Sequence, residues 1–278
     1  MLQVLRERLA PVPWIVGICA VVSLGWALID RPAALSQTSE VSDGAPVIME
    51  LFTSQSCSSC PPADALLSEL GSSTKGVIPL AYHIDYWNHL GWTDSFSSRV
   101  FSQRQSDYAR AMNLDGDYTP QMVIGGAMQC VGSDRRSIAE AIAAAHRASP
   151  LGRVSLHASS SPSGPHKLQV KVNATTQISH APGATAPVVM LAIFENGLVT
   201  RIGGGENGGR EIKYDYTVRE LVPAFELNAA KGASVEKQLS IDLDPSWSLD
   251  HLGVAAFIQD PVSLKIDAAA SQYPIAMK

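Results

Sequence analysis

The sequence of 278 residues contains few charged side chains and no surplus of positive charge. Only 17% of its residues are charged, against about 25% in an ordinary soluble domain, and 46% are hydrophobic. A disordered, solvating chain combines few apolar residues with high charge, so this class of protein is excluded. The net charge of −5 provides no basic surface for a nucleic-acid backbone, and no nucleic-acid partner is expected.

Cysteine and aromatic residues are also scarce, with four cysteines and 6% aromatics. Four cysteines are too few to build a disulfide scaffold in a chain of this length, so each one is considered for its own chemistry. Two of them form a Cys-x-x-Cys motif at Cys57 and Cys60, and no second such motif is present to complete a zinc site. Glycine and proline usage is close to average, which excludes collagen-like and low-complexity chains.

The first 36 residues predict export from the cytoplasm. A tip with Arg6 and Arg8 precedes residues 11–29, which carry no charge and would span about 28 Å as a helix, enough to cross a bilayer core. One interpretation is an uncleaved membrane anchor, and the other is a signal peptide with small residues at Ala34 and Ser36. Both place the working part in the periplasm or outside the cell, with membrane contact only through this segment. Residues 37–45 are interpreted as a tether.

Residues 46–149 predict an α/β unit with the element order β-α-β-α-β-β-α. Short apolar runs indicate the strands, and apolar positions on one side indicate the helices. Gly71 is expected just past the end of the first helix, and Gly125 and Gly126 are expected to form a two-residue hairpin turn. The predicted strands are 47–52, 77–85, 121–124 and 127–131, and the predicted helices are 61–70, 95–113 and 137–148.

After Pro150 the helical periodicity disappears, and short apolar or alternating runs are separated by glycine, proline, serine and asparagine. This pattern predicts an all-β, sandwich-like domain over residues 150–278. The stretch 203–208 satisfies the G-x-G-x-x-G pattern of dinucleotide sites, but no helix is expected after it, so it is interpreted as a loop. The predicted strands are 153–158, 167–174, 188–194, 234–243 and 253–259.

The Cys-x-x-Cys motif lies between the first predicted strand and the first predicted helix. Free N–H groups and the positive dipole end at a helix start stabilise a thiolate over a thiol, so Cys57 is a candidate nucleophile. Cys60 lies one turn further on and can close a disulfide with it. Pro61 and Pro62 are tolerated there, because the N–H groups of a first turn have no helical partner. A redox pair, an inert structural disulfide and a metal site remain as interpretations.

A proline at the start of a strand supports the redox interpretation. Pro120 follows Thr119 and opens a predicted strand, where a missing N–H is harmless. Together with the strand–Cys-x-x-Cys–helix unit and the strand that ends at Asp85, this arrangement resembles the thioredoxin superfamily over residues 46–149. The resemblance implies that the Thr119–Pro120 bond is cis and that Pro120 holds extended substrate chain beside Cys57.

Longer strings of sequence are more specific. They are similar to an exported bacterial family, catalogued as domain-of-unknown-function family 1223, which implies a thioredoxin-like fold but no established substrate or reaction. The similar strings are residues 50–64, 83–87 and 118–121 in the first half, and residues 196–201 and 205–207 in the second.

Four more side chains are candidates for the site. Glu50 lies seven residues before Cys57, near the point where thioredoxins place a buried carboxylate, so the resemblance implies a base; the alternative is a solvent-facing strand residue. His83 and Asp85 are two residues apart and are therefore expected on one side of a strand, with Trp87 continuing the row. These three are interpreted as lining a groove for substrate, and the alternative is core packing.

Cys130 is the third cysteine of the exported part. Across the predicted hairpin it is expected roughly opposite Gln121, within reach of Pro120. A free buried thiol, a redox partner and a metal co-ligand are its three interpretations.

These observations predict an extracytoplasmic thiol–disulfide oxidoreductase. Cys57 exchanges with a substrate disulfide, Cys60 resolves the mixed disulfide, and Thr119 and Pro120 position the substrate backbone. The expected partners are a protein thiol or disulfide and a second redox protein. The chemistry requires no ion or organic cofactor.

The alternative is a non-catalytic, thioredoxin-like binding module. In it the Cys57–Cys60 pair is a structural disulfide, or a Cu(I) or Zn site completed by Cys130 or His83. The two serines between the cysteines carry no charge, so the sequence leaves the direction of redox transfer open.

Overall fold

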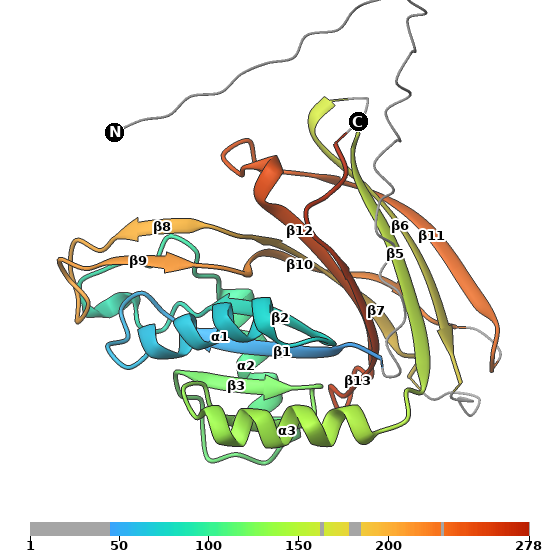
Figure 1. Cartoon of the computed structure of the whole chain (residues 1–278), viewed down its shortest axis with the longest axis horizontal. Helices are drawn as coiled ribbons and strands as arrows, with labels where there is room; N and C mark the ends of the chain where they lie inside the picture. Colours follow the sequence, from blue (N-terminus) through green and yellow to red (C-terminus); the bar gives the residue numbers. More distant parts are fainter. Residues whose placement is uncertain (1–44, 162–163, 178–184, 229–230, 278) are drawn as a thin grey trace, which may run out of the picture. The chain divides into compact units, whose positions relative to one another are not determined.

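A computed structural model describes residues 45–161, 164–177, 185–228 and 231–277 (Figure 1). The predicted signal peptide or anchor, and the tether up to residue 44, lie outside the described residues. Within the described residues, no helix is long and apolar enough to cross a membrane.

The first half has the predicted order of elements. Its strands β1, β2, β3 and β4 alternate with three helices as the hydrophobic pattern indicates. A short 3-10 helix η1, Asn88–Leu90, lies between β2 and α2. The elements are β1 (Val47–Thr53), α1 (Pro61–Ser73), β2 (Val77–His83), α2 (Arg99–Ala111), β3 (Gln121–Ile124), β4 (Met128–Val131) and α3 (Arg135–Arg147).

Two helix ends differ from the prediction. α1 continues through Gly71 to Ser73, and the Thr74 N–H donates to the Leu70 carbonyl at 2.9 Å where it ends. Glycine is needed at position 71 for a close approach, since a Cβ there would lie 2.5 Å from the Tyr216 ring. α2 begins later than expected, because the hydroxyl of Ser98 accepts the Val100 N–H and caps the helix. Asp94, just before the predicted start of this helix, is bound to His83.

The β3–β4 hairpin has a three-residue loop, not the two-residue turn that was predicted. Ile124 pairs with Met128, so Ala127 belongs to the loop with the two glycines. The extra residue shifts the register by one position. Cys130 therefore lies opposite Met122, and the predicted pairing with Gln121 is wrong.

The second half is rich in strands, as predicted. Five of its strands match the predicted runs closely, whereas β8, β9, β10 and β13 were not predicted as separate strands. The elements are β5 (Gly152–Ser161), β6 (Gly164–Thr176), β7 (Val188–Glu195), β8 (Leu198–Arg201), β9 (Glu211–Tyr214), β10 (Thr217–Glu226), β11 (Ser234–Asp242), η2 (Leu249–His251), β12 (Leu252–Gln259) and β13 (Ile266–Gln272).

One eight-stranded sheet runs through both halves, in the order β13-β12-β7-β10-β2-β1-β3-β4. β1 and β2 are parallel, and β3 runs antiparallel to β1. β10 joins the edge of β2, where Thr217 pairs with Ala81 and the Ala81 N–H donates to the Tyr216 carbonyl at 2.8 Å. The change of pattern at residue 150 therefore marks a change of element type, and strands from both sides of it share this sheet.

Helices cover both faces of β1, so its side chains are buried on both sides. Met49 and Leu51 pack with α1 and α3 on one face, whereas Ile48 and Phe52 pack with α2 on the other. In the second half, the three-stranded sheet β11-β6-β5 packs its apolar residues against those of β7 and β12. Two sheets thus face each other there, and one of them is the sheet shared with the first half.

Candidate functional site

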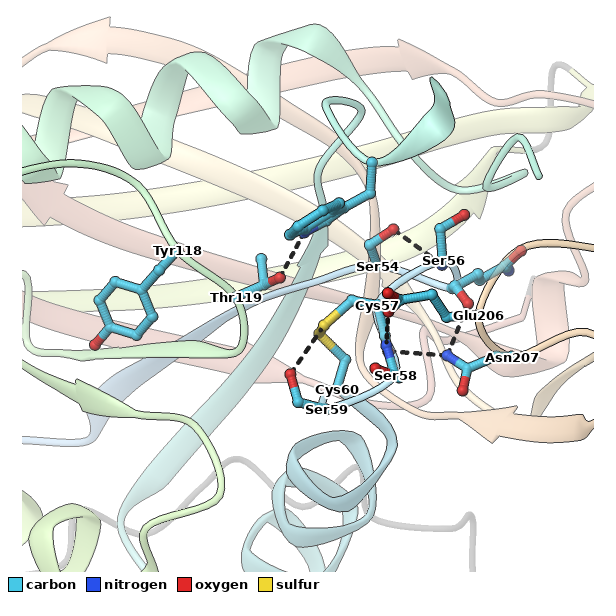
Figure 2. The surroundings of a disulfide bond; sticks show 12 residues. Ser54, Ser56, Cys57, Ser58, Ser59, Cys60, Tyr118, Thr119, Glu206 and Asn207 are labelled. Atoms are coloured by element: carbon cyan, nitrogen blue, oxygen red, sulfur yellow. Dashed lines mark hydrogen bonds between the residues drawn. A yellow bond between two sulfur atoms is a disulfide. The ribbon is translucent and has the colours of Figure 1, made fainter. Parts of the chain in front are cut away.

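The Cys57–Cys60 disulfide lies in the turn that leads from β1 into α1 (Figure 2). The Cα atoms of the two cysteines are 5.4 Å apart, and the Cys60 N–H donates to the Cys57 carbonyl at 3.2 Å. The Ser59 hydroxyl lies 3.3 Å from the Cys57 sulfur. Pro61 occupies the first position of α1, as the motif predicted.

Both cysteines are buried although the motif lies at the surface. Cys57 is 3% exposed and Cys60 is fully buried, whereas Ser58 and Ser59 between them are exposed. A partner that approaches this turn therefore meets the serines first and has limited access to the Cys57 sulfur.

The Thr119–Pro120 bond is cis, which confirms that prediction. The Trp87 indole N–H donates to the Thr119 hydroxyl at 2.7 Å, so two predicted substrate-binding residues are in direct contact (Figure 2). A Cβ on Gly132 would approach Pro120 at 3.0 Å and Ala63 at 3.2 Å, which places Pro120 close to the first turn of α1.

His83 lies in a buried cluster behind the cysteine turn. Its Nδ1 is 2.7 Å from a carboxylate oxygen of Asp94, and its ring is 5.1 Å from that of Tyr214. Burial disfavours the charged imidazole, but the Asp94 carboxylate outweighs it and raises the pKa of His83. Burial likewise opposes the charge of Asp94, but His83 and two backbone N–H donors lower the pKa of this carboxyl.

Asp64 belongs to the same cluster and was not predicted. It follows Cys60 by one helical turn, with its N–H on the Cys60 carbonyl at 3.1 Å. Burial raises the pKa of Asp64 to about 7, against the opposing effect of His83. Within the described part of the chain, its two carboxyl oxygens, the Thr53 hydroxyl, His83 Nε2 and the Tyr214 hydroxyl make no hydrogen bond of normal geometry, although the Thr53 hydroxyl lies close enough to lower the pKa of Asp64. The cluster thus contains a buried acid that titrates near neutrality.

Asp85 does not share the side of His83, and this prediction was wrong. β2 ends at His83, so the alternation of side chains does not continue to Asp85. The hydroxyl of Ser102 on α2 donates to the Asp85 carboxylate. The Asp85 N–H donates to the oxygen of this hydroxyl at 3.0 Å.

Glu50 is buried, but its carboxylate faces α2 and not the cysteines. Arg104 donates to it at 2.7 Å and the Tyr108 hydroxyl also donates to it. The neighbouring residue Leu51 faces α1, so the two side chains point to opposite faces of the sheet. The expectation that Glu50 exchanges protons with Cys60 is corrected by this orientation.

Cys130 is a free, half-buried thiol. Burial raises the pKa of Cys130 to about 11, and Asp134 adds to this effect, so the thiolate is rare at neutral pH. Among the described residues, no group of three or more histidine, cysteine, aspartate or glutamate side chains is arranged to hold a metal ion.

The loop between β8 and β9 reaches the cysteine turn from the second half of the chain. The Asn207 amide donates to the Gln55 carbonyl at 3.0 Å and to the Cys57 carbonyl at 2.8 Å. The Glu206 carboxylate accepts the Ser58 N–H at 2.9 Å (Figure 2). Two neighbouring residues of this loop therefore hold the backbone of the Cys-x-x-Cys turn.

Trp92 joins the same assembly and packs against this loop. Its indole N–H donates to the Gln55 side chain at 2.8 Å, and its carbonyl accepts the Ser56 hydroxyl at 2.8 Å. A Cβ on Gly203 would lie 2.9 Å from the Trp92 ring, and one on Gly204 would lie 2.6 Å from the Gly91 carbonyl. Only glycine lets this loop pack so closely, which gives the glycine-rich stretch a structural reason.

Sequence reasoning missed Asp64, Asp94, Glu206 and Asn207. Asp64 had a local signal, since it lies in the first turn of a helix that begins with the motif. For Glu206 and Asn207 the sequence offered no local signal, because their contacts span about half of the chain. They were marked only by their place in a string similar to a known family.

Comparisons with known proteins agree with this description. Among curated proteins, none matches the chain significantly. Protein AGR_C_4864 from Agrobacterium tumefaciens has a crystal structure with a TM-score of 0.61 and 26% identity, over 83% of this chain and 95% of that one. HBP35 of Porphyromonas gingivalis has a TM-score of 0.63 and 14% identity, over 85% and 77%, a likeness of fold alone. Residues 48–259 match the family described as "Protein of unknown function (DUF1223)". The chain therefore belongs to the DUF1223 family.

Proposed function

We propose that this protein is a thiol–disulfide oxidoreductase that acts through Cys57 and Cys60. The observation that carries the proposal is the disulfide itself, which joins two cysteines one turn apart between a buried strand and a helix. The Thr119–Pro120 bond, cis and close to the first turn of α1, supports it.

The proposal includes a thioredoxin-like fold for the first half. The element order β1-α1-β2-α2-β3-β4-α3 supports this, as does the neighbour order β2-β1-β3-β4 with β1 parallel to β2. Substrate chain would lie beside the disulfide against Thr119 and Pro120, with Trp87 behind them.

In the reducing direction, the Cys57 thiolate attacks one sulfur of a substrate disulfide. A mixed disulfide forms, and the other substrate sulfur leaves as a thiolate that takes up a proton. The Cys60 thiolate then attacks the Cys57 sulfur, releases the second substrate sulfur and closes the Cys57–Cys60 bond. Two electrons pass to the substrate, and a dithiol reductant returns them; in the oxidising direction the steps reverse.

In this proposal Asp64, and not Glu50, is the carboxyl that exchanges protons with Cys60. It is a buried carboxyl one turn after Cys60, its oxygens have no partner among the described residues, and its pKa of about 7 suits proton exchange near neutrality. Glu50 keeps a structural role, since Arg104 and Tyr108 hold its carboxylate on the other face of the sheet.

The proposed location is outside the cytoplasm, where a disulfide persists. It rests on the basic tip and the uncharged residues 11–29 of the sequence. The proposed partners are a protein thiol or disulfide and a second redox protein.

The test is catalysis of insulin reduction by dithiothreitol with the full-length chain. Cys57→Ser is expected to abolish catalysis, because Cys60 is fully buried and the Cys130 thiol is protonated at neutral pH. Cys130→Ser is the matched control and should keep the wild-type rate, since its thiol is protonated at neutral pH. Wild-type catalysis by Cys57→Ser would refute the proposal.

A structural disulfide is the second candidate, favoured by the burial of both sulfur-bearing residues. The reduction potential separates the two functions. Exchange catalysts lie between about −120 and −270 mV, whereas structural disulfides lie below about −300 mV. A value in the lower range, with slow reduction by small thiols, would favour the structural role.

A further inference from the structure

One negative charge lies where the start of a helix would otherwise favour anions. Glu206, 148 residues away in sequence, places its carboxylate on the Ser58 N–H at 2.9 Å. This N–H belongs to the residue next to Cys57. The hydrogen bond lowers the pKa of Glu206, so the carboxylate is ionised at neutral pH.

Apart from Ser59, residues 58–62 of this turn offer no free backbone donor to a thiolate. Pro61 and Pro62 have no N–H, and the Cys60 N–H already donates to the Cys57 carbonyl at 3.2 Å. The Ser58 N–H is occupied by Glu206. The Ser59 hydroxyl, 3.3 Å from the Cys57 sulfur, is the one polar side-chain contact recorded for that sulfur in the described structure.

Glu206 is held in place by its neighbour. Asn207 is 1% exposed, and its amide donates to two carbonyls of the cysteine turn at 3.0 and 2.8 Å. Its side-chain oxygen accepts a hydrogen bond from Arg210 at 2.8 Å. Asn207 therefore anchors the backbone beside Glu206, and the exposed Glu206 carboxylate reaches the Ser58 N–H from this anchored loop.

We infer that Glu206 is a redox-tuning residue, whose charge on the Ser58 N–H disfavours the Cys57 thiolate and stabilises the Cys57–Cys60 disulfide. The inference rests on the proposed function and gives it a direction. Reduction of the pair takes up two electrons and leaves a thiolate or thiol at Cys57, and a nearby negative charge destabilises the thiolate. The reduced pair then gives up its electrons readily, so it works as a reductant of substrate disulfides. A dithiol of lower potential reduces the pair again.

The test compares Glu206→Gln with Glu211→Gln in the full-length protein. Glutamine keeps an oxygen that can accept the Ser58 N–H and removes only the charge. Glu211 lies exposed on β9, at the other end of the same loop, and provides the matched loss of one negative charge. The other charged groups of the turn, Asp64, His83 with Asp94, and Arg210, remain in both variants.

Two quantities are measured: the equilibrium of the Cys57–Cys60 pair with glutathione, and the pH midpoint of Cys57 alkylation in the reduced protein. Glu206→Gln is expected to shift the equilibrium toward the reduced form by about two- to fivefold, as for an exposed charge pair, and to lower the alkylation midpoint. Both shifts should shrink in 1 M salt, because salt screens exposed charges. Glu206→Asp should stay close to wild type.

An unchanged equilibrium and midpoint in Glu206→Gln would overturn the inference, and so would equal shifts in Glu211→Gln or shifts that ignore salt. These readouts use small thiols and need no catalysis. Failure of insulin reduction in the wild type would therefore refute the proposed function, while the two measurements would still decide the role of Glu206.

Discussion

Replacing Asp64 with asparagine is expected to stabilise the protein at alkaline pH and to leave its stability nearly unchanged at acidic pH. The carboxyl is buried, and neither of its oxygens has a hydrogen-bond partner in the described structure. Burial raises its pKa from 3.8 to about 7. Asparagine has nearly the same shape and carries no charge at any pH, so the variant removes only the titration.

The direction in which the free energy of unfolding changes with pH follows from proton binding. Between about pH 4 and pH 7 the folded protein keeps a proton on Asp64 that the unfolded chain has released. The free energy of unfolding therefore falls as the pH rises through this window and is level above it. The difference between a pKa of 3.8 and one of about 7 corresponds to about 4 kcal/mol in the free energy of unfolding. The charge of Asp64 raises the pKa of His83 and of Tyr214, so the difference between the two proteins measures the titration of Asp64 together with its effect on these neighbours.

Urea denaturation of the oxidised proteins at pH 4, 6 and 8 measures this difference. The free energy of unfolding of Asp64→Asn, relative to wild type, should rise by about 4 kcal/mol from pH 4 to pH 8. Asp115→Asn, at an exposed position, is the control and should show no such trend. A difference that is the same at pH 4 and pH 8 would refute the reasoning, because it would mean that Asp64 titrates as an exposed acid does.

Two further predictions separate structural from functional side chains. Glu50→Gln should cost about 3–5 kcal/mol in urea denaturation, because it leaves Arg104 charged and buried, while the glutathione equilibrium of the disulfide stays unchanged. A shifted glutathione equilibrium would contradict this and would support a role for Glu50 in the redox chemistry. Trp87→Phe removes the N–H donor to Thr119 and should raise KM for a disulfide substrate by about fivefold, with the reduction potential unchanged. A lower kcat at constant KM would argue against substrate positioning.

Features set by local sequence were predictable. The strand–Cys-x-x-Cys–helix unit needs only an apolar run, two cysteines one turn apart and prolines that a first turn tolerates. The cis bond before Pro120 was expected from the resemblance to the thioredoxin superfamily and not from local sequence alone. Errors arose at the ends of elements. Asp85 lies beyond the last residue of β2, so the strand is shorter than predicted. The β3–β4 loop has one residue more than its two glycines suggest.

Contacts between distant segments were not predictable from pattern. Arg104, on a helix 54 residues after Glu50, neutralises that carboxylate, so no local signal could tell a base from a buried ion pair. Asn207 lies 150 residues after Cys57. Residues 203–208, which include it, have the G-x-G-x-x-G spacing of a dinucleotide-binding loop. Only the absence of an expected helix after them excluded that interpretation.

The second half of the chain determines what the cysteine turn can do. β10 pairs with β2, so the edge of the first-half sheet continues into β7 and β12. This shared sheet leads into the β8–β9 hairpin, whose loop binds the backbone on both sides of Cys57. A helix start alone favours a thiolate. Here a carboxylate from the other half opposes that preference, so the reactivity of Cys57 is a property of the whole sheet and cannot be derived from the first half by itself.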